Sequence, residues 1–538
     1  MKKIAKFNKD ILDIMNEKSR KNSGESLKRF NNGLIQTFAS GNDVETIEIK
    51  CQTPANIPDD AETLRIDDYS SYPIYVIATK SKVSVVAEAD KIEWRDDLSQ
   101  LNLLEKAQNI KHIIVHDVDF SKCKSLSEIF YSDRSVIDFD FRNLSGFENV
   151  EEAESMFSMC ENIRTIDMAE FRGMLPKCTT NMFSCCCYLT EIKNILQISS
   201  NCVETGGMFS HCYKIRTLDL NDWDMSNVRC MNGMFEQCNN LKELHIEDWN
   251  TKNMVDASYM FSQCGIEKMP VERWDVSNLL NAKAMFCYCD NMISLDLSQW
   301  NTENLQYTDS MFGGCENLEH VNLKNWKTSK VLNVSGMFER CKNLKELHIE
   351  GWNTKNVVDA SYMFSQCGIE KMPVEDWDVS SLRDAKYMFC NCKSMVSLDL
   401  SQWNTKELRY TANMFNGCEN LEHVNLQNWR TSKALSMFGM FRSCKKLKEL
   451  DLSSFRTSAV SDMGFMFSDC CELKTLNLHQ FALGKCINMG SIFKGCKNLM
   501  VLDTSGWKIR NDCHTRNMLL GCTSLVYIDE NVYRAHSI

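Results

Sequence analysis

The chain has few residues that interrupt regular structure and no long apolar run. It contains 6 prolines and 22 glycines in 538 residues, with 43% hydrophobic and 25% charged residues. This is an ordinary composition for a folded chain, so disorder is not expected beyond the extreme N-terminus. No apolar stretch approaches the roughly 18 residues that a membrane-spanning helix needs. We therefore expect a folded chain without a membrane span.

The chain also lacks a basic excess. Its 61 Lys and Arg residues face 72 Asp and Glu residues, which gives a formal net charge of -11. Nucleic-acid backbones are bound by clustered Lys and Arg, and no such stripe is present. A nucleic-acid partner is therefore not expected.

The first residues lack the unbroken apolar core of a secretory signal, because Lys6, Lys9 and Asp10 interrupt it. Their spacing is instead typical of an amphipathic helix. We expect residues 1–45 to form a helical segment and the chain to stay in the cytoplasm.

Sequence patterns for catalysis and metal binding are absent. There is no P-loop, HExxH, GxSxG or dinucleotide glycine fingerprint. The 27 cysteines show no paired CxxC spacing, and 15 of them belong to one repeated position. We predict buried thiols at that position, no metal, no cofactor and no enzymatic activity.

What the chain does have is a strict internal period. The motif Met-Phe-x-x-Cys, with small variations, places a cysteine every 26 residues from Cys160 to Cys522, except for two intervals of 25. Degenerate copies centred on Asp133 and Ala107 extend the array to about 17 repeats. A fixed period of this length indicates a solenoid, in which each repeat contacts only its neighbours.

One repeat predicts the local structure of all of them. In "CNNLKELHIEDWNTKNMVDASYMFSQ" (238–263), Leu244 and Ile246 alternate with polar residues, as in a short strand with one wet face. Ala257, Met260 and Phe261 then follow at helical spacing. Ten of the eleven tryptophans share one position after the strand, which predicts a buried spine.

The predicted fold class is thus an α/β repeat solenoid, with one short parallel strand and one short helix in each repeat of ~26 residues. The strand-like residues 46–100 are expected to form a β-rich N-terminal cap, and residues 101–538 the solenoid. Within it, 239–341 and 342–444 form a tandem duplicated block of four repeats. Pro270 and Pro373 lie in the two 25-residue repeats and predict a break or bulge in the sheet.

The repeated words also point to a known family. The segment "MVSLDLSQWNTKELRYTANMFNGC" (395–418) resembles the BspA-like leucine-rich repeat, a bacterial surface-protein type. The segment "YPIYVIATKSKVSVVAEADKIEW" (72–94) resembles the stretch that precedes these repeats in that family. The resemblance covers about residues 60–530. It implies a leucine-rich repeat solenoid that binds other macromolecules, often at a cell surface, and it implies no catalysis.

Polar side chains at the outward strand positions are the candidate site. Stacked acidic residues repel one another unless a cation or a basic partner intervenes, so this face predicts a protein partner rich in Lys or Arg. An exposed sheet face that is polar only for solubility is the competing interpretation. The candidate partner-binding residues are Asp219, Glu243, His245, Glu247, Asp296, His320, Asn322, Glu346, His348, Glu350, Asp399, His423, Asn425 and Asp451.

Other interpretations stay open at this point. The chain could be a secreted or surface adhesin for a host protein or glycan, in which case an oxidising environment should produce disulfides. It could also be a hydrolase that uses His and Asp on the sheet face, which requires a concave pocket. The duplicated block could supply two docking patches, or it could only lengthen the scaffold.

Overall fold

The structure is a computed structural model that describes residues 4–7, 44–51, 61–65, 74–79, 81–87, 89–95, 109–132 and 134–528. It contains two compact units. Unit 1 comprises Met1–Met254 with Gln263–Ile266, and unit 2 comprises Val255–Ser262 with Glu267–Ile538. Within the described residues, no helix has the length and apolar character needed to cross a membrane.

Unit 1 begins with two β-sheets. The larger sheet has six strands in the order β3 (Glu62–Arg65), β4 (Ile74–Ala78), β5 (Lys82–Ala87), β2 (Thr46–Cys51), β7 (His112–His116) and β9 (Asp138–Arg142). Strands β3, β4 and β5 pair antiparallel, and the remaining pairs are parallel. Alternating apolar residues such as Ile47 and Ile49 on β2 are buried.

The smaller sheet corrects the prediction for the N-terminus. Its strand order is β1 (Ile4–Phe7), β6 (Lys91–Arg95) and β8 (Val118–Lys122). Ile4–Phe7 pair in parallel with β6, so the predicted helix is wrong at these residues. Pairing with a distant strand overrides the local amphipathic pattern here. The rest of the predicted helical segment, up to residue 43, lies outside the described residues.

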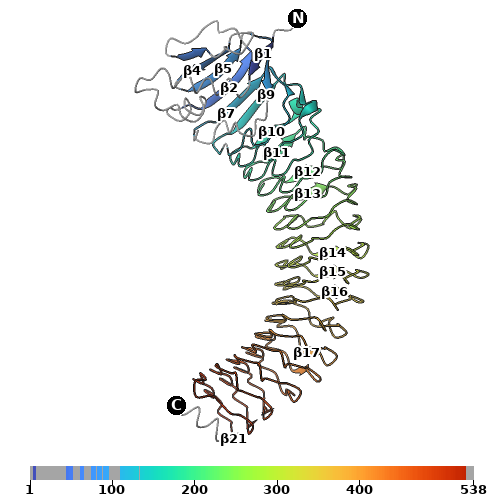
Figure 1. Cartoon of the computed structure of the whole chain (residues 1–538), viewed down its shortest axis with the longest axis vertical. Helices are drawn as coiled ribbons and strands as arrows, with labels where there is room; N and C mark the ends of the chain where they lie inside the picture. Colours follow the sequence, from blue (N-terminus) through green and yellow to red (C-terminus); the bar gives the residue numbers. More distant parts are fainter. Residues whose placement is uncertain are drawn as a thin grey trace. The chain divides into compact units, whose positions relative to one another are not determined.

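The repeats form a parallel β-solenoid of about 15 turns, rather than the 17 repeats counted from the sequence. Asp133 and Ala107, which mark the two degenerate copies, are outside the described residues. The strands are short, and those that pair are parallel and offset by 26 residues, as for β14, β15 and β16, which lie side by side in Figure 1. The repeats of unit 1 contain the strands β10 (Thr165–Asp167), β11 (Glu191–Lys193), β12 (Thr217–Asp219) and β13 (Glu243–His245). They also contain two 3-10 helices, η3 (Phe147–Asn149) and η4 (Ala169–Phe171).

Unit 2 continues the same pattern of three-residue strands. They are β14 (Ser294–Asp296), β15 (His320–Asn322), β16 (Glu346–His348), β17 (Ser397–Asp399), β18 (His423–Asn425), β19 (Thr475–Asn477) and β20 (Val501–Asp503), followed by β21 (Tyr527–Ile528). The central residue of each three-residue strand is buried and its neighbours face outward.

The predicted short helix in each repeat is wrong. The only helical elements among the described residues are η3 and η4. Where a helix was expected, amide groups alternate between two acceptors: the Tyr259 N–H donates to the Lys283 carbonyl in the next repeat (2.8 Å), whereas the Met260 N–H donates to the Ala257 carbonyl (3.2 Å). Tyr259 has a left-handed backbone (φ 58°), which ends any helix there. The segment is a chain of β-turns that forms a second ladder between repeats.

The tryptophan and cysteine predictions are confirmed by burial and by hydrogen bonding. Trp403 is 1% exposed, and its indole N–H donates to the Val374 carbonyl of the preceding repeat (2.9 Å). The Cys418 thiol is fully buried and donates to the Phe389 carbonyl (2.9 Å). Phe389 and Phe415 stack with ring centroids 5.6 Å apart. Each core position thus forms a column that joins neighbouring repeats.

The break predicted at the prolines is also present. No strand is assigned at Pro270 or Pro373, although both lie in the described part of the chain. The 25-residue repeats also require a glycine, as Gly368 shows. A Cβ atom there would lie 2.0 Å from the carbonyl oxygen of Lys342, so only glycine fits.

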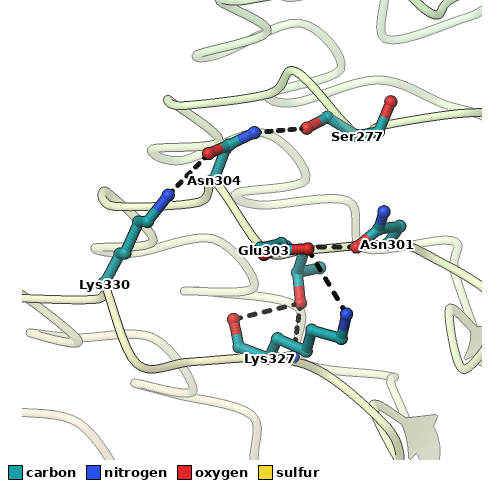
Figure 2. A network of polar contacts seen from close by, with 7 residues as sticks. Ser277, Asn301, Glu303, Asn304, Lys327 and Lys330 are labelled. Carbon is teal, nitrogen blue, oxygen red and sulfur yellow. Dashed lines mark hydrogen bonds and ion pairs between the residues drawn. The ribbon is translucent and has the colours of Figure 1, made fainter.

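The Trp-Asn-Thr motif owes its recurrence to hydrogen bonds between repeats, shown for one copy in Figure 2. The Thr302 hydroxyl accepts a hydrogen bond from the Lys327 N–H (2.7 Å) and donates to the Lys327 carbonyl (3.4 Å). The Asn304 amide donates to the Ser277 carbonyl (2.8 Å) and accepts from the Lys330 ammonium (2.7 Å). The motif therefore stabilises the stacking of repeats. The outward strand positions make no part of this network and are the candidates for binding.

Candidate functional site on the sheet face

All of the predicted site residues have exposed or half-exposed side chains on the sheet face or directly after it. Asp219, Glu243, His245 and Glu247 belong to unit 1. There Asp219 of β12 is in register with His245 of β13, and the His245 ring lies 3.9 Å from the Glu247 carboxylate. The remaining candidates belong to unit 2, where the structure brings several of them together.

The first group in unit 2 lies on β14, β15 and β16. The Asn322 amide donates to the Asp296 carboxylate (3.1 Å), and His320 Nδ1 lies 3.1 Å from the Glu346 carboxylate. His348 lies at the edge of the group, and its Nδ1 atom is 3.2 Å from the Glu350 carboxylate. We call these residues the first face group.

The second group repeats the first at an offset of 103 residues. The Asn425 amide donates to the Asp399 carboxylate, again at 3.1 Å. His423 Nδ1 lies 3.4 Å from the Glu449 carboxylate, and Asp451 stands where the first group has His348. We call these residues the second face group.

A hollow of ≈ 610 Å³ opens over the second face group. Its polar lining includes the predicted residues Asp399, His423, Asn425 and Asp451. The sequence interpretation missed the other polar residues of the lining, which are Glu375, Ser397, Glu449, Thr475 and Asn477. Glu449 could have been found, since it lies 103 residues after Glu346 and two residues before Asp451.

Hydrogen bonds keep the face carboxylates charged. The pKa of Asp399 is lowered, first because the Ser401 N–H donates to it (2.8 Å), with further help from the Ser401 side chain and Asn425. Partial burial raises the pKa of Asp296, but hydrogen bonds from Ser298 and Asn322 outweigh it and the net shift is downward. Both carboxylates are thus held as anions across the neutral range.

Carboxylates at the margin of the sheet are paired with lysines, whereas the carboxylates in the described lining of the hollow have no lysine or arginine beside them in that lining. Lys433 pairs with Glu407 (2.7 Å) and Lys445 pairs with Glu419 (3.1 Å), each across one repeat. Among the described residues that line the hollow there is no lysine or arginine. The centre of the face therefore offers carboxylates to an incoming cation.

The arrangement shows polar binding groups and no activated nucleophile. Ser397, His423 and Glu449 occupy one position in three successive repeats, but no hydrogen bond joins Ser397 to His423 in the described structure. A general base must reach the proton that it removes. Nor do three His, Cys, Asp or Glu side chains converge on a metal-sized site in the part of the chain that the structure describes.

Two of the solved structures with some likeness are described as leucine-rich proteins. A leucine rich cell surface protein from Faecalibacterium prausnitzii A2-165 is 12% identical, with 83% of this chain and 96% of that chain covered and a TM-score of 0.28. A leucine-rich repeat protein from Eubacterium ventriosum ATCC 27560 is 11% identical, with 61% and 94% covered and a TM-score of 0.33. TLR13 in a complex with ssRNA13 is 14% identical, with 82% and 76% covered and a TM-score of 0.18. Nothing about the partner of this chain follows from them.

A family match identifies the chain. No curated protein matches its sequence. The family described as "Mycoplasma protein of unknown function, DUF285" matches three overlapping segments, 203–321, 307–425 and 410–527. That family is associated with BspA-like repeats, which confirms the resemblance seen in the sequence. The matches cover more than half of the chain, which therefore belongs to the DUF285 family.

Proposed function

We propose that this protein is a non-enzymatic scaffold that docks a basic segment of another protein on the sheet face of unit 2. The observation that carries the proposal is the hollow over the second face group, which is lined by Glu375, Asp399, Glu449 and Asp451 without a compensating lysine or arginine. Lysine and arginine side chains are the complement of such a surface.

The same geometry favours recognition of an extended segment. The face carries acceptors at each repeat, and neighbouring strands of a sheet lie about 4.8 Å apart. Charge complementarity of this kind guides the approach of a partner and selects against acidic ones. The hollow gives the partner's side chains room to approach the carboxylates closely.

The duplication adds a finer proposal. The two face groups are four repeats apart in unit 2, which is roughly 20 Å along a sheet of this spacing. A partner with two basic clusters at that separation would bind both groups, and the second contact would be intramolecular. The duplicated block then supplies two equivalent docking patches.

The test uses a synthetic peptide of alternating Lys and Thr, which is extended and basic. The full-length chain is compared with the variant Asp399→Asn, Glu449→Gln, Asp451→Asn by fluorescence anisotropy. We expect roughly tenfold weaker binding, since each exposed charge pair contributes about 0.2–1 kcal/mol.

The matched control changes Glu407, Glu419 and Glu422 to Gln. It removes the same formal charge at the margin of the same repeats, where lysines already compensate the carboxylates. Equal weakening in both variants would show that only net charge matters, and the proposed face would be wrong.

We also propose that the protein works in a reducing compartment such as the cytoplasm. The column cysteines lie in neighbouring repeats at a spacing that a disulfide can bridge. They are nevertheless thiols that donate to phenylalanine carbonyls, as Cys444 does to Phe415 (3.1 Å). A thiol count on native protein tests this, because an exported adhesin is expected to carry disulfides.

A further inference from the structure

Two cysteines outside the repeated column lie in successive repeats of unit 2, 27 residues apart and one position out of register with the pairing of Asn488 and His514. The Cys486 N–H donates to the Leu483 carbonyl (3.0 Å), and the Cys513 N–H makes the matching bond to the Arg510 carbonyl (3.1 Å). Between the two repeats, the His514 N–H donates to the Ile487 carbonyl (2.9 Å). Cys486 and Cys513 are therefore stacked neighbours.

Their spacing suits a disulfide. Neighbouring repeats of a parallel ladder lie about 4.8 Å apart, which is inside the range of about 4.4–6.8 Å between Cα atoms joined by a disulfide. The Cys486 thiol donates to the Asn488 carbonyl (3.4 Å) and the Cys513 thiol to the His514 carbonyl (4.0 Å), both at long distance, and the two thiols are close enough to shift each other's pKa. Little movement is needed to join them.

The two thiols differ in access and in charge. Cys486 is buried, whereas Cys513 is half-buried and reachable from solvent. The interaction with Cys486 lowers the pKa of Cys513; burial and Asp512 raise it, and the Arg510 guanidinium lowers it. The pKa of Cys486 is raised, by Cys513 first and then by burial. Cys513 is thus the better nucleophile and Cys486 the resolving thiol.

Arg510 is held in place on both sides of the pair. Its guanidinium makes two contacts with the Asp512 carboxylate (2.7 and 2.8 Å) and donates to the Gly484 carbonyl (3.1 Å) of the preceding repeat. It therefore spans the two repeats next to the thiols. Its charge lowers the pKa of Cys513 less than the paired Asp512 carboxylate raises it, so the interaction with Cys486 is the main cause of the lowered pKa.

We propose that Cys486 and Cys513 are a redox-active pair that forms a reversible disulfide by exchange with a low-molecular-weight disulfide. The Cys513 thiolate attacks one sulfur of that disulfide, forms a mixed disulfide and releases one thiolate. Cys486 then loses its proton and attacks the Cys513 sulfur, which releases the second thiolate. The two cysteines together lose two protons and two electrons, and the small disulfide is reduced to two thiolates.

The other cysteines of these repeats provide the contrast. Cys496 and Cys522 are also neighbours whose thiols interact, but these thiols donate to the carbonyls of Phe467 (3.0 Å) and Phe493 (3.1 Å) in the preceding repeats. Forming a disulfide there would break both of these short hydrogen bonds between repeats, whereas joining Cys486 to Cys513 would break only the longer contacts to the carbonyls of Asn488 (3.4 Å) and His514 (4.0 Å). The new disulfide would instead link the repeat after β19 to the repeat after β20 without disturbing the column.

The test incubates the native full-length protein with oxidised glutathione and maps the products by peptide mass spectrometry. We expect a Cys486–Cys513 disulfide that dithiothreitol reverses. In Cys486→Ser, glutathione should remain attached to Cys513, and in Cys513→Ser, Cys486 should remain a thiol. Cys496→Ser serves as the control and should still form the Cys486–Cys513 disulfide.

Three results would overturn the proposal. The first is a disulfide that maps to Cys496 and Cys522 in place of the proposed pair. The second is glutathione on Cys513 in the unsubstituted protein with no resolution by Cys486. The third is no reaction at Cys513 while exposed control thiols react. Circular dichroism of each variant shows whether it is folded, so loss of the disulfide through misfolding is recognised.

Discussion

The two face groups of unit 2 share their hydrogen-bond pairs and differ in where one carboxylate lies. Asp296 with Asn322 and Asp399 with Asn425 have the same separation of 3.1 Å. His348 and Glu350 of the first group, however, correspond to Asp451 and Ser453 in the second. Residues 346–348 form strand β16, whereas residues 449–451 form no strand, and the hollow lies over the latter.

The difference separates what the scaffold needs from what a partner would detect. The tryptophan column is the same in both groups: Trp300 and Trp403 are buried and donate to Val271 and Val374 (3.0 and 2.9 Å). The outward positions and the strand at the edge of the group differ, whereas the changes at buried positions keep them apolar, as at Val334 and Met437. A comparison of paired variants can therefore test scaffold and surface independently.

The largest effect is expected from the tryptophans. Trp300→Ala and Trp403→Ala should each cost about 3–5 kcal/mol, because a fully packed aromatic ring is lost. Trp403→Phe should cost less, since Phe455 occupies the same column position and is fully buried. Urea denaturation followed by circular dichroism measures all three. Unequal costs for the two alanine variants would show that the copies are not equivalent scaffolds.

The next effect is expected from the buried threonines. Thr302 and Thr405 each accept the N–H of a residue in the next repeat, Lys327 and Arg430, at 2.7 Å. Replacing either by Val leaves that N–H unsatisfied in a buried site, at about 1–3 kcal/mol. Thr→Ser retains the hydroxyl and should cost clearly less by the same denaturation measurement. Equal costs for Val and Ser would refute the role of the hydroxyl.

A smaller effect is expected from exchanging the residues at one outward position that differs in charge between the face groups, His348 and Asp451. Asp451→His should weaken binding of the Lys-Thr peptide, and His348→Asp should strengthen it. One exposed charge pair corresponds to about 0.2–1 kcal/mol, or roughly 1.4- to 5-fold in affinity. Fluorescence anisotropy at low salt gives the dissociation constants. Stronger binding by Asp451→His together with weaker binding by His348→Asp would contradict the docking proposal.

The smallest effect is a contribution to acid stability. The pKa of Asp399 is held below its ordinary value of 3.8, chiefly by the Ser401 N–H. A lowered pKa in the folded state stabilises the fold above the ordinary value, and this stabilisation is lost as the pH falls through the lowered value. Asp399→Asn should therefore flatten the acid limb of a plot of thermal midpoint against pH, and Asp296→Asn should do the same. An unchanged acid limb would contradict the assignment.

The sequence predicted the solenoid because its period and its inward positions are both explicit. Leu244 is 5% exposed as expected, and its neighbours Glu243 and His245 face solvent. The helix prediction was wrong although Ala257 and Met260 are buried as expected. A chain of β-turns buries residues at the same i, i+3 spacing, and the left-handed residue that distinguishes the two is a tyrosine, Tyr259, which carries no turn signal.

The sequence predicted which residues face outward, but it did not predict where the hollow forms. Alternation along the strand is enough to place Asp399 and His423 outside. The hollow lies where residues 449–451 form no strand, and the sequence "KELDLS" there differs little from "KELHIE" on β16. Local pattern alone could not show which of two similar repeats would open.

Carboxyl footprinting with a carbodiimide tests the central claim most directly. The full-length protein is labelled with and without the Lys-Thr peptide, and labelling is read at single carboxylates by mass spectrometry. The account predicts that the peptide protects Asp399, Glu449 and Asp451 and leaves Glu407 and Glu419 unchanged. Protection of Glu407 and Glu419 with no protection of the second face group would contradict it.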